Sequence, residues 1–212
     1  MLDALHARHI ANLRRMTVSI DEVGMLLGGR YIMFFAEVGL MSRHARLVTE
    51  GICSPDVLEI GLGLGIFAEQ LSREDLGSYT VVEPSREVIS KTWDRVVAAL
   101  GVPTELREEA WQSARFEPET YDSIMYDTVP PEGQADRDFG IFVEEVALRV
   151  LRPGGRLTFF SPGKQVSPAR ADILNAAFDS WTADSYSIPP EVVPPGWTLG
   201  TRDFRVPVAV KG

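Results

Sequence analysis

The feature that most constrains this chain is a short apolar run that leads into three closely spaced glycines. Residues 57–60 have the composition of a buried strand, and Gly61, Gly63 and Gly65 follow in a Gly-x-Gly-x-Gly pattern. Residues 66–71 then continue as a helix. Glycine allows a sharp turn and a close approach to a ligand, because no Cβ stands in the way. The pattern predicts a ligand-binding turn between a strand and a helix, at the carboxyl edge of a sheet.

The spacing of the glycines distinguishes two classes of ligand. The dinucleotide fingerprint Gly-x-Gly-x-x-Gly requires a glycine at position 66, where this chain has Ile66. The third glycine instead comes one residue early, and Glu59 precedes the first glycine by two residues. The spacing disfavours an NAD-dependent oxidoreductase. Taken alone, the loop is also compatible with a plain structural turn.

Strand and helix patterns alternate along the rest of the chain. Further strands are expected at 79–82, 104–107, 121–126 and 156–160, and further helices at 86–100, 139–150 and 169–178. This alternation predicts an α/β fold with a mostly parallel sheet covered by helices on both faces. A closing pair of strand fragments is expected within 204–210.

The N-terminal part has a different pattern. Helices are expected at 4–18 and 31–49, and residues 19–22 have the composition of a helix cap for a segment that the glycines at 28–29 end. We therefore expect residues 1–50 to form a helical cap that carries substrate contacts. Residues 51–212 are expected to form one compact domain.

Composition narrows the classes of function. The 212 residues include 21 basic and 30 acidic side chains, for a net charge of -9, and a single cysteine, Cys53. A general nucleic-acid binder needs a basic face, and a disulfide framework or thiolate metal cluster needs more cysteines. No apolar run reaches the roughly 20 residues of a membrane-spanning helix. The N-terminus also lacks the apolar core of a signal peptide. We expect a cytoplasmic monomer or homodimer that acts on a small molecule, without a metal, nucleic acid or membrane partner.

A second acid completes a cofactor pattern. Glu83 ends the strand at 79–82, at the position where an acid binds ribose hydroxyls about 20 residues after such a loop. With the Leu-Arg-Pro-Gly-Gly-Arg-Leu turn at 151–157, these features resemble the class I S-adenosylmethionine-dependent methyltransferases. The resemblance implies a Rossmann-like, mostly parallel seven-stranded sheet and S-adenosylmethionine as the cofactor. The loop residues that it assigns to cofactor binding, besides Glu83, are Glu59, Gly61, Leu62, Gly63, Leu64, Gly65 and Ile66.

A narrower resemblance involves segments on both sides of this loop. The sequence Tyr126-Asp127-Thr128-Val129-Pro130 is similar to the Tyr-Asp-Thr-aromatic-Pro segment of guanidinoacetate N-methyltransferase. The spacing of Gly29, Met33, Glu37 and Met41 matches the N-terminal substrate segment of that family. Trp111-Gln112 resembles its Trp-Glu pair near the adenine. Residues 193–195 and 206–212 resemble its C-terminal strand region.

The family resemblance implies roles for individual residues. Glu37 and Asp127 would hold the guanidinium of the acceptor, and Asp127 would also accept a proton. A guanidinium presents a planar fork of N–H donors that carboxylates match. Cofactor contacts are implied for Met33, Met41, Trp111, Gln112 and Asp127, and substrate contacts for Thr128, Pro162 and Gly163. At 162–163 the family places backbone amides against the substrate carboxylate.

The sequence departs from the family around the acceptor. Ala36 and Val129 stand where the family has a tryptophan and an aromatic residue, and no tryptophan precedes Trp93. We therefore expect a guanidino compound other than guanidinoacetate, larger or less polar. Two alternatives stay open. One is a methyltransferase of a hydroxyl, carboxylate or carbon acceptor, and the other is a non-catalytic cofactor-binding protein.

Overall fold

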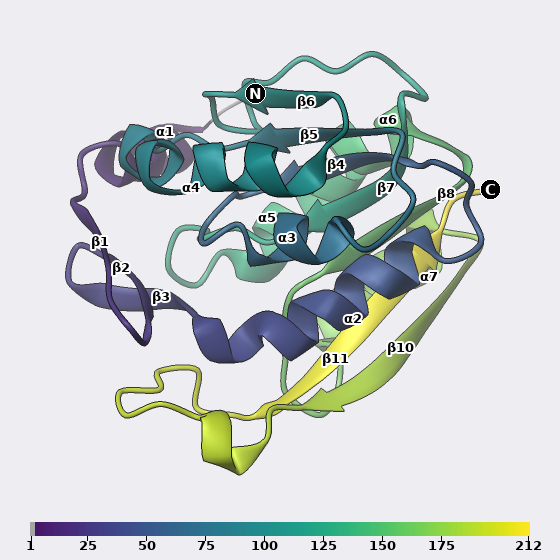
Figure 1. The fold of residues 1–212 in the computed structure, drawn as a ribbon. Coiled ribbons are helices and arrows are strands. Elements are labelled where there is room, and N and C mark those ends of the chain that lie inside the picture. Colours follow the sequence, from purple (N-terminus) through teal and green to yellow (C-terminus); the bar gives the residue numbers. More distant parts are fainter. Residues whose placement is uncertain (1–2) are drawn as a thin grey trace.

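A computed structural model describes residues 3–212, and its centre is a mostly parallel sheet (Figure 1). The strand order is β10-β11-β8-β7-β4-β5-β6, and short β9 pairs with β11. The strands are β4 (Asp56–Ile60), β5 (Ser78–Val82), β6 (Thr104–Arg107), β7 (Tyr121–Tyr126), β8 (Leu151–Phe159), β9 (Ser161–Pro162), β10 (Ser180–Ser187) and β11 (Asp203–Val210). Strands β4 to β8 are mutually parallel, whereas β11 runs antiparallel to β8 and to β10.

Helices cover both faces of this sheet. They are α1 (Ala4–Leu13), α2 (Val38–Thr49), α3 (Ile66–Leu71), α4 (Arg86–Leu100), α5 (Ala135–Phe142), α6 (Leu148–Val150) and α7 (Pro168–Ala177). A π-helical turn, η2 (Val143–Ala147), joins α5 to α6, and η3 (Pro190–Val192) is a 3-10 turn. No helix within residues 3–212 combines the length and apolarity needed to cross a membrane.

Alternation along the strands divides the core into two apolar clusters. Val57 of β4 belongs to the cluster with α2, α3 and α4, whereas Leu58 belongs to the cluster with α5, η2 and α7. Because successive strand side chains point to opposite faces, a strand that is apolar throughout must be covered on both. The predicted class, a Rossmann-like α/β fold, is confirmed.

The N-terminal segment is less helical than its sequence pattern suggests. The predicted helix at 4–18 ends at Leu13, and a three-stranded antiparallel sheet follows: β1 (Val18–Ile20), β2 (Gly24–Leu27) and β3 (Arg30–Phe34). The predicted cap at 19–22 is wrong, since Asp21 accepts hydrogen bonds from the N–H groups of Val23 and Gly24 in a turn between β1 and β2. The predicted helix at 31–49 begins only at Val38, after β3 and the 3-10 turn η1 (Phe35–Glu37).

Two other segments differ from expectation. The predicted pair of strand fragments at 204–210 is one continuous strand, β11, and its neighbour β10 was not predicted at all. Strand β10 lies at the sheet edge and has no fully buried residue, so its sequence lacks a clear apolar face. Strand β8 starts at Leu151 rather than at Arg156. Residues 152–155 loop out of its ladder, because Tyr121 pairs with Leu151 and Ser123 with Arg156.

Candidate active site

The site lies where the strand order reverses. Strand β4 pairs with β7 on one side and with β5 on the other, with Ile60 opposite both Tyr126 and Val82. The residues that follow these strands, Gly61, Glu83 and Asp127, therefore meet at one edge. In open α/β sheets this switch point at the carboxyl edge is the usual ligand site. A cavity of about 1050 Å³, open mouth included, lies there.

Two positions of the loop favour glycine because each combines a positive φ with a close neighbour. Gly61 has φ +95° and lies against the Asp127 carbonyl, which a Cβ would approach to 2.0 Å. At Gly63, with φ +48°, a Cβ would come within 1.9 Å of the Met33 sulfur. Both residues line the cavity. At these two positions the loop presents backbone without side chains to the cavity, which fits the charged amino-acid end of S-adenosylmethionine.

Glu83 closes the loop from the side of β5. Its two carboxylate oxygens accept hydrogen bonds from the N–H groups of Leu62, at 3.1 Å, and Ser85, at 2.8 Å. The side chain lines the cavity although the residue is only 7% exposed. Burial raises the pKa of Glu83 to about 7. Its position fits the ribose-binding role implied by the sequence.

Asp127 follows β7 and lines the same cavity. Its backbone N–H donates to the Ile60 carbonyl at 3.0 Å, which fixes it beside the glycine loop. Burial raises the pKa of Asp127 to about 7, and the Arg170 charge opposes this increase. A carboxyl group with such a pKa can exchange a proton near neutral pH.

Two further carboxyl groups lie behind the cavity wall. Glu37 is 2% exposed and accepts a hydrogen bond from the Phe34 N–H at 2.8 Å. Burial, together with the Asp127 charge, raises the pKa of Glu37 to about 8. Glu59 is buried too and accepts a hydrogen bond from the Tyr79 hydroxyl. Burial raises its pKa well above the ordinary value, and the charges of Asp127 and Glu83 add to this effect.

The structure brings eight of the seventeen predicted site residues to the cavity wall. Those that line it are Met33, Gly61, Gly63, Glu83, Trp111, Gln112, Asp127 and Thr128. Glu37, Met41, Glu59, Leu62, Leu64, Gly65 and Ile66 are not among the lining residues; Met41, for example, is fully buried in the core. Pro162 lines a smaller neighbouring cavity, and Gly163 lies beside it in sequence.

Helix α1, part of the expected N-terminal cap, covers one side of the cavity, and its particular contacts were not predicted. His9, Ile10 and Leu13 contribute to the cavity wall, and His9 Nε2 lies 2.6 Å from the Val129 carbonyl. No local sequence signal indicated this, because the partners of α1 lie more than 100 residues away along the chain.

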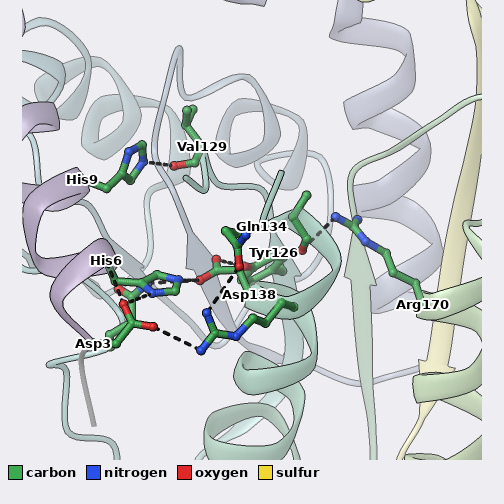
Figure 2. A network of polar contacts seen from close by, with 11 residues as sticks. Asp3, His6, His9, Tyr126, Val129, Gln134, Asp138 and Arg170 are labelled. Atoms are coloured by element: carbon green, nitrogen blue, oxygen red, sulfur yellow. Dashed lines mark hydrogen bonds and ion pairs between the residues drawn. The ribbon is translucent and has the colours of Figure 1, made fainter. Parts of the chain in front are cut away.

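A buried polar network fixes α1 in this position (Figure 2). The two ring nitrogens of His6 lie 2.8 Å from Asp3 and 2.9 Å from Asp138. The Tyr126 hydroxyl donates to the other Asp138 oxygen at 2.5 Å. Asp138 also lines the cavity and accepts a hydrogen bond from Gln112 at 3.5 Å. The network therefore links α1, which covers the cavity like a lid, to the cavity wall near Trp111.

Among residues 3–212, no group of three or more His, Cys, Asp or Glu side chains is arranged to hold a metal ion. The cavity combines a glycine loop, the buried acid Glu83 at the end of β5 and the Asp127 carboxyl group at the end of β7. This fold and this site define a class I S-adenosylmethionine-dependent methyltransferase.

Comparison with known proteins identifies the family within this class of methyltransferases. A family model described as guanidinoacetate N-methyltransferase matches residues 21–168. The chain belongs to the guanidinoacetate N-methyltransferase family. A search of curated protein sequences finds no significant match.

Solved structures of low sequence identity share the fold. The N-methyltransferase NodS from Bradyrhizobium japonicum is 17% identical, with a TM-score of 0.63 over 84% of this chain and 97% of that one. The 1,6-didemethyltoxoflavin-N1-methyltransferase of Burkholderia thailandensis, solved with S-adenosylhomocysteine, is 17% identical, with a TM-score of 0.58 over 84% and 81%. The tRNA (m1A58) methyltransferase TrmI of Aquifex aeolicus is 16% identical, with a TM-score of 0.54 over 85% and 70%.

Proposed function

We propose that this methyltransferase methylates a nitrogen of a small guanidino compound. The observation that carries the proposal is the pair of buried carboxyl groups, Asp127 in the cavity wall and Glu37 behind it. Burial raises the pKa of Asp127 to about 7 and that of Glu37 to about 8, where the Asp127 charge adds to the increase, so ionising both groups together is unfavourable. Such a pair is costly without a cation, and a guanidinium would supply one. Asp127 would contact it directly, and Glu37 would contribute its charge from behind the wall.

The chemistry follows from the position of Asp127. When bound, S-adenosylmethionine supplies a methyl group on a positively charged sulfur. A protonated guanidinium is a poor nucleophile, so the attacking nitrogen must lose a proton as its bond to the methyl carbon forms and the carbon–sulfur bond breaks. The Asp127 carboxylate would orient this nitrogen and accept the proton. Helix α1 would exclude water from the reacting groups.

The test uses methyl-labelled S-adenosylmethionine with a panel of guanidino acids, guanidino amines and simple alkylguanidines. We expect label transfer to at least one of them, and methylation on nitrogen by mass spectrometry. Intact binding of S-adenosylhomocysteine, measured by calorimetry, with no transfer to any member of the panel would contradict the guanidino acceptor.

A second candidate is methylation of a non-guanidino acceptor on oxygen or carbon. It is favoured by Val129, which lines the cavity at 42% exposure where the family has an aromatic residue. Replacement of Asp127 by asparagine would discriminate the two. A guanidino acceptor loses its proton acceptor in this variant, whereas an acceptor that needs no carboxylate would be methylated at the normal rate.

A further inference from the structure

Helix α4 contacts the glycine loop through one face of its middle part. Helices α3 and α4 pack side by side, and the loop lies at the start of α3 (Figure 1). Thr92, Arg95 and Val96 are three and four residues apart, so they lie on the same side of α4. A Cβ at Gly65 would come within 2.8 Å of the Thr92 methyl group and 2.6 Å of a Val96 methyl group. None of the three residues lines the cavity, so an effect of theirs on a ligand must pass through the loop.

Thr92 holds one peptide group of this loop. Its side chain is buried, and its hydroxyl donates to the Gly63 carbonyl at 2.9 Å. In a trans peptide the C=O and the following N–H point in opposite directions. The Leu64 N–H accordingly points away from α4, toward the Met33 sulfur at 3.2 Å, and Met33 lines the cavity. A thioether is a weak acceptor. Thr92 therefore keeps the oxygen of this peptide on α4 and directs its N–H to the cavity wall.

Arg95 holds the next peptide group. Its Nη2 donates to the Leu64 carbonyl, and its Nη1 lies 3.0 Å from the Glu69 carboxylate of α3. The other two loop carbonyls, those of Leu62 and Gly65, accept hydrogen bonds from the N–H groups of Gly65 and Glu69. Backbone N–H groups bind anions, whereas carbonyl oxygens repel them. The orientation of the two peptides that α4 holds thus decides whether the loop can receive a carboxylate.

We propose that Thr92 and Arg95 are positioning residues of the cofactor site. They hold two loop carbonyls on the side of α4, so that the loop presents the Leu64 N–H rather than the Gly63 oxygen toward the carboxylate at the amino-acid end of S-adenosylmethionine. The inference concerns the cofactor alone and holds whichever acceptor is methylated. Loss of either contact should weaken ligands that carry this amino-acid end and spare ligands that lack it.

The experiment compares two ligands that differ in this end. S-adenosylhomocysteine carries the amino acid, whereas methylthioadenosine has the same adenosine and a thioether without it. Calorimetry gives the Kd of each for the wild type and for Thr92→Val, which removes the hydroxyl. The unpaired Gly63 carbonyl would rotate toward another partner in the free protein, and binding would have to turn the peptide back. We expect Kd to rise about tenfold for S-adenosylhomocysteine and to stay within about twofold for methylthioadenosine.

Two variants separate positioning from a general loss of stability. Thr92→Ser restores a hydroxyl, so its Kd for S-adenosylhomocysteine should return close to that of the wild type. Thr49→Val is the matched control, because Thr49 is also buried and donates to a backbone carbonyl, that of Ala45, at 2.9 Å. Thr49 lies in α2 and does not line the cavity. Its replacement should lower the melting temperature and leave both Kd values unchanged.

Arg95→Gln tests the second contact and does not depend on how well Thr92→Val folds. The Arg95 side chain is 47% exposed, so its loss should not prevent folding. Water can replace part of the lost contact, and we expect a rise in Kd of about threefold for S-adenosylhomocysteine alone. Unchanged affinity for S-adenosylhomocysteine in both variants, or an equal loss of affinity for the two ligands, would overturn the inference.

Discussion

The side of the cavity proposed for the cofactor contains one continuous stretch of chain, residues 59–85, whereas the side proposed for the acceptor is assembled from separate segments. Within this stretch, Glu83 accepts hydrogen bonds from the N–H groups of Leu62 and Ser85. On the proposed acceptor side, Asp127 follows β7, Glu37 ends η1 and Arg170 lies in α7. Contacts within one segment determine the geometry of the glycine loop. Side chains on separate segments can be substituted one at a time, which would alter the proposed acceptor site without altering the loop.

The largest loss of stability and of cofactor binding is expected at Gly61, where the glycine loop contacts the Asp127 backbone. Gly61→Ala would place a Cβ 2.0 Å from the Asp127 carbonyl at a φ of +95°. We expect destabilisation by about 3 kcal/mol and loss of cofactor binding, measured by urea unfolding and calorimetry. Gly101→Ala is the matched control, because Gly101 also has a positive φ, +66°, but no atom within 4 Å of the added Cβ. It should cost about 1 kcal/mol and leave cofactor binding intact. Equal behaviour of the two variants would contradict the close contact.

A smaller effect, on the rate of cofactor dissociation, is expected for α1, which covers the cavity and belongs to neither the cofactor side nor the acceptor side. Asp138→Asn removes the carboxylate charge, and an amide N–H₂ that faces His6 can no longer accept the hydrogen bond from Gln112. The loss of these charge-assisted hydrogen bonds, about 1–3 kcal/mol, would loosen α1. We expect S-adenosylhomocysteine to dissociate about tenfold faster in stopped-flow measurements, since 1.4 kcal/mol corresponds to a factor of ten.

The control is Asp172→Asn, which makes the same change of charge on the exposed face of α7. Its dissociation rate should equal that of the wild type. If Asp138→Asn also leaves the dissociation rate unchanged, α1 does not retain the cofactor.

The smallest effect is a pH dependence of stability that comes from the buried acids. Glu37, Glu83 and Asp127 have pKa values raised by burial to about 8, 7 and 7. The folded protein therefore binds more protons than the unfolded chain from the ordinary acid range up to about pH 8, and its stability must fall as the pH rises through this interval. His44, whose pKa burial lowers to about 3, has the opposite effect but only below its ordinary value of 6.5.

Unfolding of the cofactor-free protein at pH 6.5 and 8.5 measures this dependence. We expect lower stability at pH 8.5, and a smaller decrease for Glu37→Gln, which keeps an acceptor for the Phe34 N–H but cannot ionise. Stability that increases over this interval, or the same decrease in both proteins, would show that Glu37 does not titrate as described.

The same comparison explains what the sequence could and could not predict. The glycine loop, Glu83 and the parallel strands follow from local patterns, because strand, turn and helix are contiguous there. The sheet β1–β3 was missed because the spacing of Ile32, Phe35 and Val38 also fits a helix, and only pairing with β2 decides for a strand. The His6–Asp138 contact and the position of Arg170 depend on residues that tertiary packing brings together, and no local pattern encodes them.

The central claim is that Asp127 is the carboxylate that receives the acceptor, and the most direct test is single-turnover methyl transfer by wild type and Asp127→Asn. With a guanidino acceptor that the wild type methylates, we predict that the variant reacts about 10²- to 10⁴-fold more slowly, since asparagine cannot accept the proton. Its affinity for S-adenosylhomocysteine should be retained. A variant that binds the cofactor and transfers the methyl group at the wild-type rate would contradict the account.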